Sequence, residues 1–173
     1  MTIVRSPFSN IQWMCLRFKT VLNAFFLAEK AIPTLASSIP AVIVVGHSNC
    51  GGAAACLSAA QRPDTIIGGR VITVPQLPAD APLNRWLGPL TEHVTTLDLA
   101  NKPTESALPV VVKENVRMQV ENLCKSEVIA DAWVAWNEKR EGAAEVWVHG
   151  WVYDLATGRL EDLKISKGPG SAI

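Results

Sequence analysis

The chain has 173 residues, about the length of one domain, and its 16 basic residues balance its 16 acidic ones. A formal net charge of zero argues against nucleic acid or an anionic membrane surface as a partner, and no apolar run reaches the roughly 18 residues that a membrane span needs. The hydrophobic content of 49% is high for a soluble monomer and favours an oligomer with covered apolar surface. The four cysteines show no paired spacing, which indicates a reducing compartment.

The N-terminal segment has an unusual composition. Residues 1–28 contain no acidic residue, but they contain Arg5, Arg17 and Lys19. That bias is typical of a mitochondrial transit peptide, with an ordinary or mis-assigned segment as the alternative. We therefore leave residues 1–20 unassigned, place one domain at residues 21–173, and expect a cytoplasmic protein with the mitochondrion as the alternative.

The first half of the chain predicts a strand between two helices. Residues 21–32 have helical periodicity and stop before Pro33. The run "AVIVV" at 41–45 is apolar and β-branched, which predicts a strand buried on both faces in a parallel sheet, and residues 51–60 then read as a helix. Residues 62–82 are rich in proline and glycine, so we expect a long loop with at most one short strand, "RVITV".

The second half predicts three helices and a closing hairpin. A helix is expected over residues 83–99, and Pro109 is expected to start another that buries Val112, Val116, Val120 and Leu123. A further helix covers residues 128–138. The segment "EVWVHGWVYD" alternates with period two, "LATG" is a turn, and "RLEDLKI" returns as a second strand. The fold class is therefore α/β, a mainly parallel sheet flanked by helices with a C-terminal β-hairpin.

The stretch "AVIVVGHSNCGG" ends a strand in a polar turn and fits two chemistries. In the first, Ser48 is a nucleophile on a strand-to-helix elbow, served by an acid and a histidine downstream such as Asp131 and His149. Cys50 takes the place of the second glycine of that G-x-S-x-G pattern, so the match is incomplete. The alternative is that Ser48 is a turn residue that donates a local hydrogen bond.

In the second chemistry, His47 and Cys50 are two ligands of a zinc ion. Zinc accepts imidazole nitrogen and thiolate sulfur in a tetrahedron of four ligands, and a helix that starts just after Cys50 favours its thiolate. H-x-x-C alone supplies half of such a site. A buried histidine beside a small apolar cysteine is the alternative.

Three segments together resemble the β-class carbonic anhydrases: "VIVVGHSNCGG", "VVKENVRMQVENLCKSEVIADAW" and "EVWVHGWVYDLATGRLEDL". The resemblance implies that family's fold, its assembly from dimers or larger oligomers, and reversible hydration of carbon dioxide to bicarbonate. It also implies one zinc ion, held by Cys, His and Cys, that lowers the pKa of its bound water. His47 and Cys50 match two of these ligands, and Gly51 matches the residue whose backbone N–H lies beside the bound anion.

The family's first zinc ligand and its catalytic Asp and Arg belong to a C-x-D-S-R segment, which this sequence does not contain. No residue here therefore matches that catalytic pair. Cys15 is the remaining candidate for a third ligand, with a buried or incidental thiol as the alternative. The resemblance thus predicts a chain that lacks the family's N-terminal segment. A non-catalytic homologue that acts as a dimerisation partner is the alternative to an active enzyme.

The other thiols and imidazoles are expected to be structural. Cys56 and Cys124 fall on the packed rows of their helices and are predicted to be core residues. His93 is predicted to lie at the surface. His149 is predicted to be a buried histidine bonded to backbone on the same strand face as Trp147.

Overall fold

A computed structural model describes residues 4–5, 12–13, 41–62, 66–67 and 70–171. The predictions for Cys15 and for a helix at 21–32 lie outside these residues. Two strands of two residues each, β1 (Val4–Arg5) and β2 (Gln12–Trp13), pair antiparallel. Among the described residues, every helix is too short or too polar to cross a lipid bilayer.

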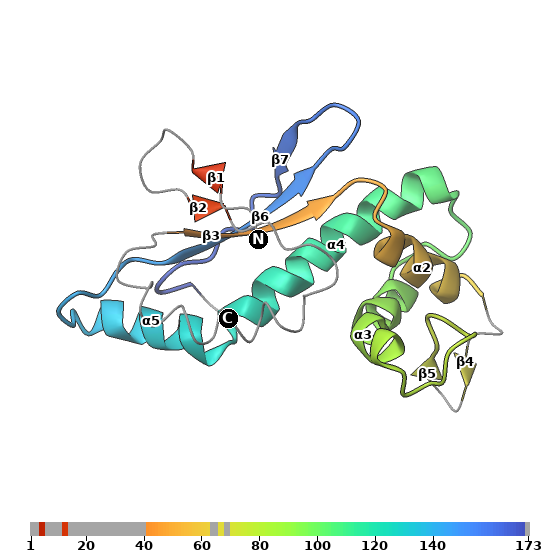
Figure 1. Cartoon of the computed structure of the whole chain (residues 1–173), viewed down its shortest axis with the longest axis horizontal. Helices are drawn as coiled ribbons and strands as arrows, with labels where there is room; N and C mark the ends of the chain where they lie inside the picture. The colour runs from red at the N-terminus through yellow and green to blue at the C-terminus, as the bar shows by residue number, and fades with distance from the viewer. Residues whose placement is uncertain (1–3, 6–11, 14–40, 63–65, 68–69, 172–173) are drawn as a thin grey trace. The chain divides into compact units, whose positions relative to one another are not determined.

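The central sheet has three strands in the order β3-β6-β7: β3 (Ala41–His47), β6 (Trp147–Tyr153) and β7 (Leu160–Asp162). The arrows of β3 and β6 run in the same direction (Figure 1), whereas β6 and β7 pair antiparallel with Trp151 opposite Asp162. The predicted α/β class and C-terminal hairpin are confirmed. The chain forms two compact units, one of Val45–Gln119 and Gly150–Leu163 and one of the remaining segments.

In the first unit, helices α2 (Gly51–Ala60) and α3 (Pro82–Thr96) pack against each other. The Sγ atom of Cys56 donates to the carbonyl of Leu87 at 3.7 Å. The loop between these helices contains two short antiparallel strands, β4 (Ile66–Ile67) and β5 (Arg70–Val71), where the sequence predicted at most one. Both helices begin within a residue of their predicted starts.

Helix α4 (Thr104–Cys124) begins five residues before the predicted start at Pro109. Pro109 is exposed and lies inside the helix, and the turn before it contains buried Ala107, whose N–H donates to the carbonyl of Pro103 at 3.0 Å. Three of the four predicted core positions are buried, Val112, Val116 and Val120, but the row continues into Cys124 rather than Leu123.

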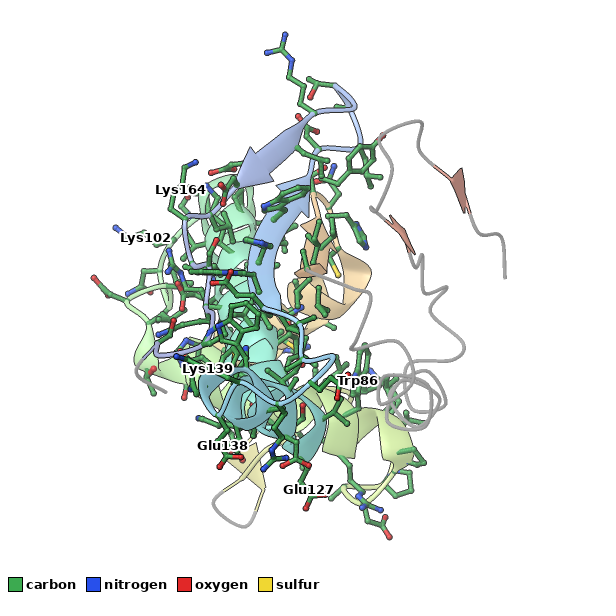
Figure 2. The ribbon with its side chains drawn as sticks, turned by 90° about the vertical axis from the view of Figure 1, so that its left-hand side faces the viewer. Trp86, Lys102, Glu127, Glu138, Lys139 and Lys164 are labelled. Atoms are coloured by element: carbon green, nitrogen blue, oxygen red, sulfur yellow. The ribbon has the colours of Figure 1, made fainter. Side chains whose placement is uncertain are left out.

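The second unit contains helix α5 (Glu127–Asn137), which was predicted within one residue at each end. Trp133 is buried, and its Nε1–H donates to the carbonyl of Val146 at 2.8 Å. The charged side chains of Glu127, Glu138 and Lys139 mark the ends of this helix and lie exposed (Figure 2). The helix therefore buries Ile129 and Trp133 and leaves its ends exposed, together with Val134 and Trp136.

The burial of β3 differs from its prediction. Among the described residues, none of its seven positions is buried, and Val45 is 43% exposed. Only β6 pairs with it among the described strands. Gly46 faces α4, whereas Val45 points to the opposite face because side chains alternate along a strand. An apolar β-branched run predicts a strand but not how much of it the rest of the chain covers.

Candidate metal centre

His47 and Cys50 lie at the two ends of a tight turn. His47 is the last residue of β3, and Cys50 is the residue that caps the start of α2, with extended backbone angles φ −64° and ψ 119°. Asn49 between them has a φ of 57°, the left-handed conformation that asparagine tolerates better than most residues. The strand, turn and helix thus place an imidazole and a thiol at one end of β3.

The imidazole of His47 is half-buried, and its Nδ1 lies 2.9 Å from the carbonyl oxygen of Ser48. A carbonyl oxygen only accepts, so Nδ1 carries the hydrogen and Nε2 keeps its lone pair. A histidine that donates one ring N–H to a carbonyl while its other nitrogen stays free has the arrangement usual in metal ligands.

Cys50 is half-buried, and its carbonyl accepts the N–H of Ala54 at 2.9 Å, the first hydrogen bond of α2. The first turn of α2 holds no acidic side chain. A Cβ added at Gly51 would meet nothing within 4 Å, so there is open space beside the N–H groups that begin the helix.

These residues fit zinc in part. Imidazole nitrogen and thiolate sulfur are its preferred ligands. In the part of the chain that the structure describes, however, no group of three or more His, Cys, Asp or Glu residues is placed to hold a metal ion. His47 and Cys50 supply two donors of suitable chemistry, and Cys15 lies outside the described residues.

Ser48 makes long-range hydrogen bonds instead of the predicted local one. Its hydroxyl donates to Oδ1 of Asp154 at 3.3 Å and accepts the N–H of Leu155 at 2.9 Å, while its own N–H donates to the carbonyl of Tyr153 at 2.9 Å. These partners include no histidine, and Nδ1 of His149, the histidine of the hydrolase alternative, bonds the hydroxyl of Ser166 at 2.7 Å. The described contacts of Ser48 are thus those of a structural residue.

Asp154 is a site residue that the sequence did not single out. The hydroxyl of Thr157 donates to its Oδ2 at 2.7 Å, and the N–H of Ala156 donates to its Oδ1 at 2.9 Å. These two hydrogen bonds, with a smaller contribution from Ser48, lower the pKa of the Asp154 carboxyl below its ordinary value. The turn residues in "YDLATG" suggest such a closed loop, but nothing in the sequence connects it to Ser48.

Cys56 and Cys124 are buried, as predicted, and burial raises the pKa of both thiols. His93 is partly exposed, as predicted, and its Nε2 lies 3.3 Å from Oε2 of Glu114. The prediction for His149 is wrong, because its ring is only half-buried and stacks on Trp147 with centroids 6.4 Å apart. The buried face of β6 consists of Val148, Gly150 and Val152 instead.

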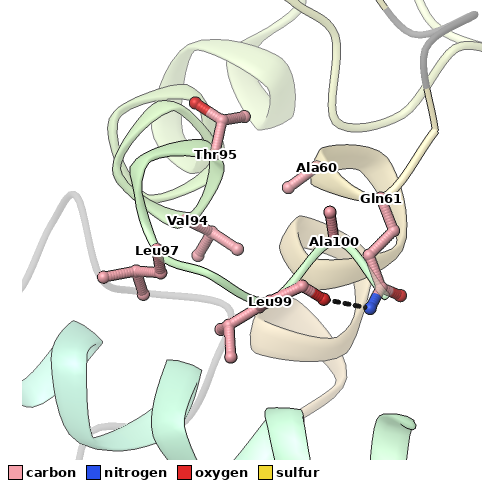
Figure 3. Close-up of a pocket in the computed structure, with 7 residues that line it drawn as sticks. All are labelled: Ala60, Gln61, Val94, Thr95, Leu97, Leu99 and Ala100. Carbon is pink, nitrogen blue, oxygen red and sulfur yellow. Dashed lines mark hydrogen bonds between the residues drawn. The ribbon is translucent and has the colours of Figure 1, made fainter. Parts of the chain in front are cut away.

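A small cavity lies beside the C-terminal ends of α2 and α3 (Figure 3). Its volume is about 20 Å³, and Gln61 closes one side by donating from Nε2 to the carbonyl of Leu99 at 2.8 Å. That volume is enough for one water molecule and too small for an organic substrate.

Comparison with known proteins agrees with this geometry. A family model described as "Carbonic anhydrase" matches residues 31–160. The fold is similar to a β-carbonic anhydrase from Coccomyxa, solved with acetazolamide, at 25% identity and a TM-score of 0.57; the match covers 86% of this chain and 56% of that one.

Two fungal structures have a similar fold at lower identity. One of two tetrameric β-carbonic anhydrases from Sordaria macrospora matches at 22% identity and a TM-score of 0.55, covering 86% of this chain and 63% of that one. The β-carbonic anhydrase CafA of Aspergillus fumigatus matches at 21% identity and a TM-score of 0.52, covering 88% and 61%. This chain thus spans less than two thirds of the length of these proteins. Its sequence match and its fold together show that the chain belongs to the β-carbonic anhydrase family.

Proposed function

We propose that this chain binds one zinc ion through His47 and Cys50 and catalyses the reversible hydration of carbon dioxide to bicarbonate. The observation that carries the proposal is the turn between β3 and α2, which presents Nε2 of His47 and the thiol of Cys50 within a chain of the β-carbonic anhydrase family. Zinc bound there would supply a water molecule with a pKa near neutrality.

The chain's own residues have distinct roles in this proposal. His47 offers Nε2 because its Nδ1–H is engaged by the carbonyl of Ser48. Cys50, the residue that caps the start of α2, offers its sulfur as the second donor. Gly51 leaves room for bicarbonate beside the free N–H groups of the first helical turn, where an anion is stabilised.

A third protein ligand is required, because catalytic zinc sites have three protein ligands and one open position. Cys15 is our candidate for this ligand, since Cys56 and Cys124 are buried on helical packing rows. No residue is assigned to the family's Asp and Arg pair. The proposal therefore predicts that Cys15→Ser reduces zinc content as strongly as Cys50→Ser does.

The test is stopped-flow hydration of carbon dioxide by the zinc-loaded protein. We expect a rate above the buffer background that is inhibited by acetazolamide, the compound present in the Coccomyxa structure. His47→Ala should abolish this rate, whereas the matched control His93→Ala removes a surface imidazole and should retain it. A rate equal to the background in folded, zinc-loaded protein would exclude the enzymatic function.

A second candidate function is that of a non-catalytic assembly partner for the same chain or for a longer relative. The exposed side chains of β6 favour it: Trp147 and Tyr153, at the two ends of the strand, are 36% and 38% exposed. Aromatic side chains of this kind are common at protein interfaces. Light scattering after gel filtration should show a dimer or larger oligomer, and Trp147→Glu should shift it toward the monomer.

A further inference from the structure

Ser48 bonds the turn that carries His47 and Cys50 to the β6–β7 hairpin. The Ser48 N–H donates to the carbonyl of Tyr153 at 2.9 Å, and the Ser48 hydroxyl accepts the N–H of Leu155, also at 2.9 Å. The same hydroxyl donates to Oδ1 of Asp154 at 3.3 Å. One serine therefore bonds three consecutive residues at the end of β6.

The hairpin side of this contact is itself held in place. The N–H of Asp154 donates to the carbonyl of Arg159 at 2.8 Å, and the carbonyl of Asp154 accepts the N–H of Gly158 at 2.8 Å. Gly158 has a φ of 69°, a left-handed conformation that glycine adopts without strain. The carboxylate of Asp154 accepts hydrogen bonds from Ala156 and Thr157, so both its side chain and its backbone are bonded within its own loop.

We propose that Ser48 and Asp154 are positioning residues that hold His47 and Cys50 at the spacing the metal requires. Ser48 is the neighbour of His47 in sequence, and its carbonyl accepts the Nδ1–H of that ring. A shift of Ser48 therefore moves both the backbone that carries the imidazole and the carbonyl that orients it. The link also restrains Asn49, whose left-handed conformation leads the chain into Cys50.

The proposal rests on the proposed function in one respect: the metal whose ligands are positioned is the zinc ion assigned to His47 and Cys50. Its structural part, that Ser48 restrains the turn, is independent of zinc. The two parts are separated by two measurements: the reactivity of the Cys50 thiol in metal-free protein, and the affinity for zinc. The reactivity of Cys50 reports on the turn because this half-buried thiol lies two residues from Ser48.

The variants are Ser48→Ala, which removes the hydroxyl, and Ser48→Thr, which keeps it. Asp154→Asn removes the charge of the acceptor. Ser106→Ala is the matched control, since that exposed serine donates its hydroxyl to the carbonyl of Pro103, only three residues before it. For the thiol measurement all variants are made in a Cys15→Ser background. For zinc affinity they are made in protein that retains Cys15.

In metal-free protein at fixed pH, Ser48→Ala should raise the rate of Cys50 modification by Ellman's reagent several-fold, roughly as expected for losing one or two ordinary hydrogen bonds. Ser48→Thr should restore the slow rate, and Ser106→Ala should leave it unchanged. In competition with a chromophoric chelator, Ser48→Ala should weaken zinc binding by about tenfold or more, as for other residues that orient metal ligands. Asp154→Asn should weaken it less, and adding it to Ser48→Ala should have little further effect.

Unchanged Cys50 reactivity in folded Ser48→Ala protein would overturn the proposal, whether or not the chain binds zinc. Unchanged zinc affinity beside altered reactivity would also overturn it, because the turn would then move without consequence for the metal. If the unmodified chain binds no zinc while Ser48→Ala still speeds the reaction, the proposed function fails and the restraint on the turn stands.

Discussion

Gly46 lies directly against Val116 of α4: a Cβ atom added at Gly46 would come 2.6 Å from Cγ2 of that valine. Real contacts between carbon atoms are about 3.5 Å or longer, so even an alanine at this position requires β3 or α4 to move. Val116 is buried and cannot give way toward solvent. The glycine before His47 thus sets how closely the strand approaches the helix.

Gly46→Ala should therefore destabilise the protein by about 1–3 kcal/mol, the usual cost of overpacking a close contact. The measurement is the free energy of unfolding from urea titration. Gly51→Ala is the matched control, because a Cβ there meets nothing within 4 Å. Equal stability of the two variants would show that β3 and α4 are not in close contact.

Trp133→Phe should destabilise the protein by about 1–3 kcal/mol, because the carbonyl of Val146 then loses its indole donor inside the core. Trp136→Phe, three residues along the same helix, alters a side chain that is 39% exposed, and its effect should stay within about 0.5 kcal/mol. Thermal unfolding of both variants checks this. A larger loss in Trp136→Phe would mean that the buried face of α5 has been misassigned.

Asp154 should make stability depend on pH in acid. Because hydrogen bonds to its carboxylate lower its pKa in the folded state, its contribution is complete above the unfolded-state pKa and disappears as the pH falls through the lower folded value. Asp154→Asn should therefore be less stable than the unmodified protein at pH 7, with a difference that shrinks below about pH 4. A difference that grows in acid would contradict the assignment.

The three described cysteines should differ in how fast their thiols react. In a Cys15→Ser variant, Cys50 should react with Ellman's reagent before Cys56 and Cys124, which are buried and have raised pKa values. Cys50→Ser should remove the fast phase, and urea should expose the slow thiols. In protein that retains Cys15, zinc added in slight excess should slow the modification of Cys50, and no protection by zinc would argue against Cys50 as a ligand.

Local sequence patterns predicted the helices of the described residues well, because the apolar residues that recur along each helix are largely those that pack. The exception is the start of α4, where Pro109 has the features of a first helical residue but lies inside a helix that begins at Thr104. Turn and cap residues likewise indicated that His47 and Cys50 flank one turn.

The bonds of Ser48 could not be predicted in this way. Its partners Asp154 and Leu155 lie 106 and 107 positions away, and a serine in a turn satisfies its hydroxyl equally well by a local bond. The exposure of Val45 was missed for a related reason, since apolar periodicity describes a strand's own residues and not the elements that cover them.

The central claim is that His47 and Cys50 bind zinc, and zinc content per chain tests it most directly. The purified protein is dialysed exhaustively and its metal measured by plasma mass spectrometry, beside His47→Ala, Cys50→Ser and the control His93→Ala. We predict about one zinc per chain in the unmodified protein and in His93→Ala, and close to none in the other two variants. Zinc near zero in the unmodified, folded protein, or zinc retained in His47→Ala and Cys50→Ser, would contradict the claim.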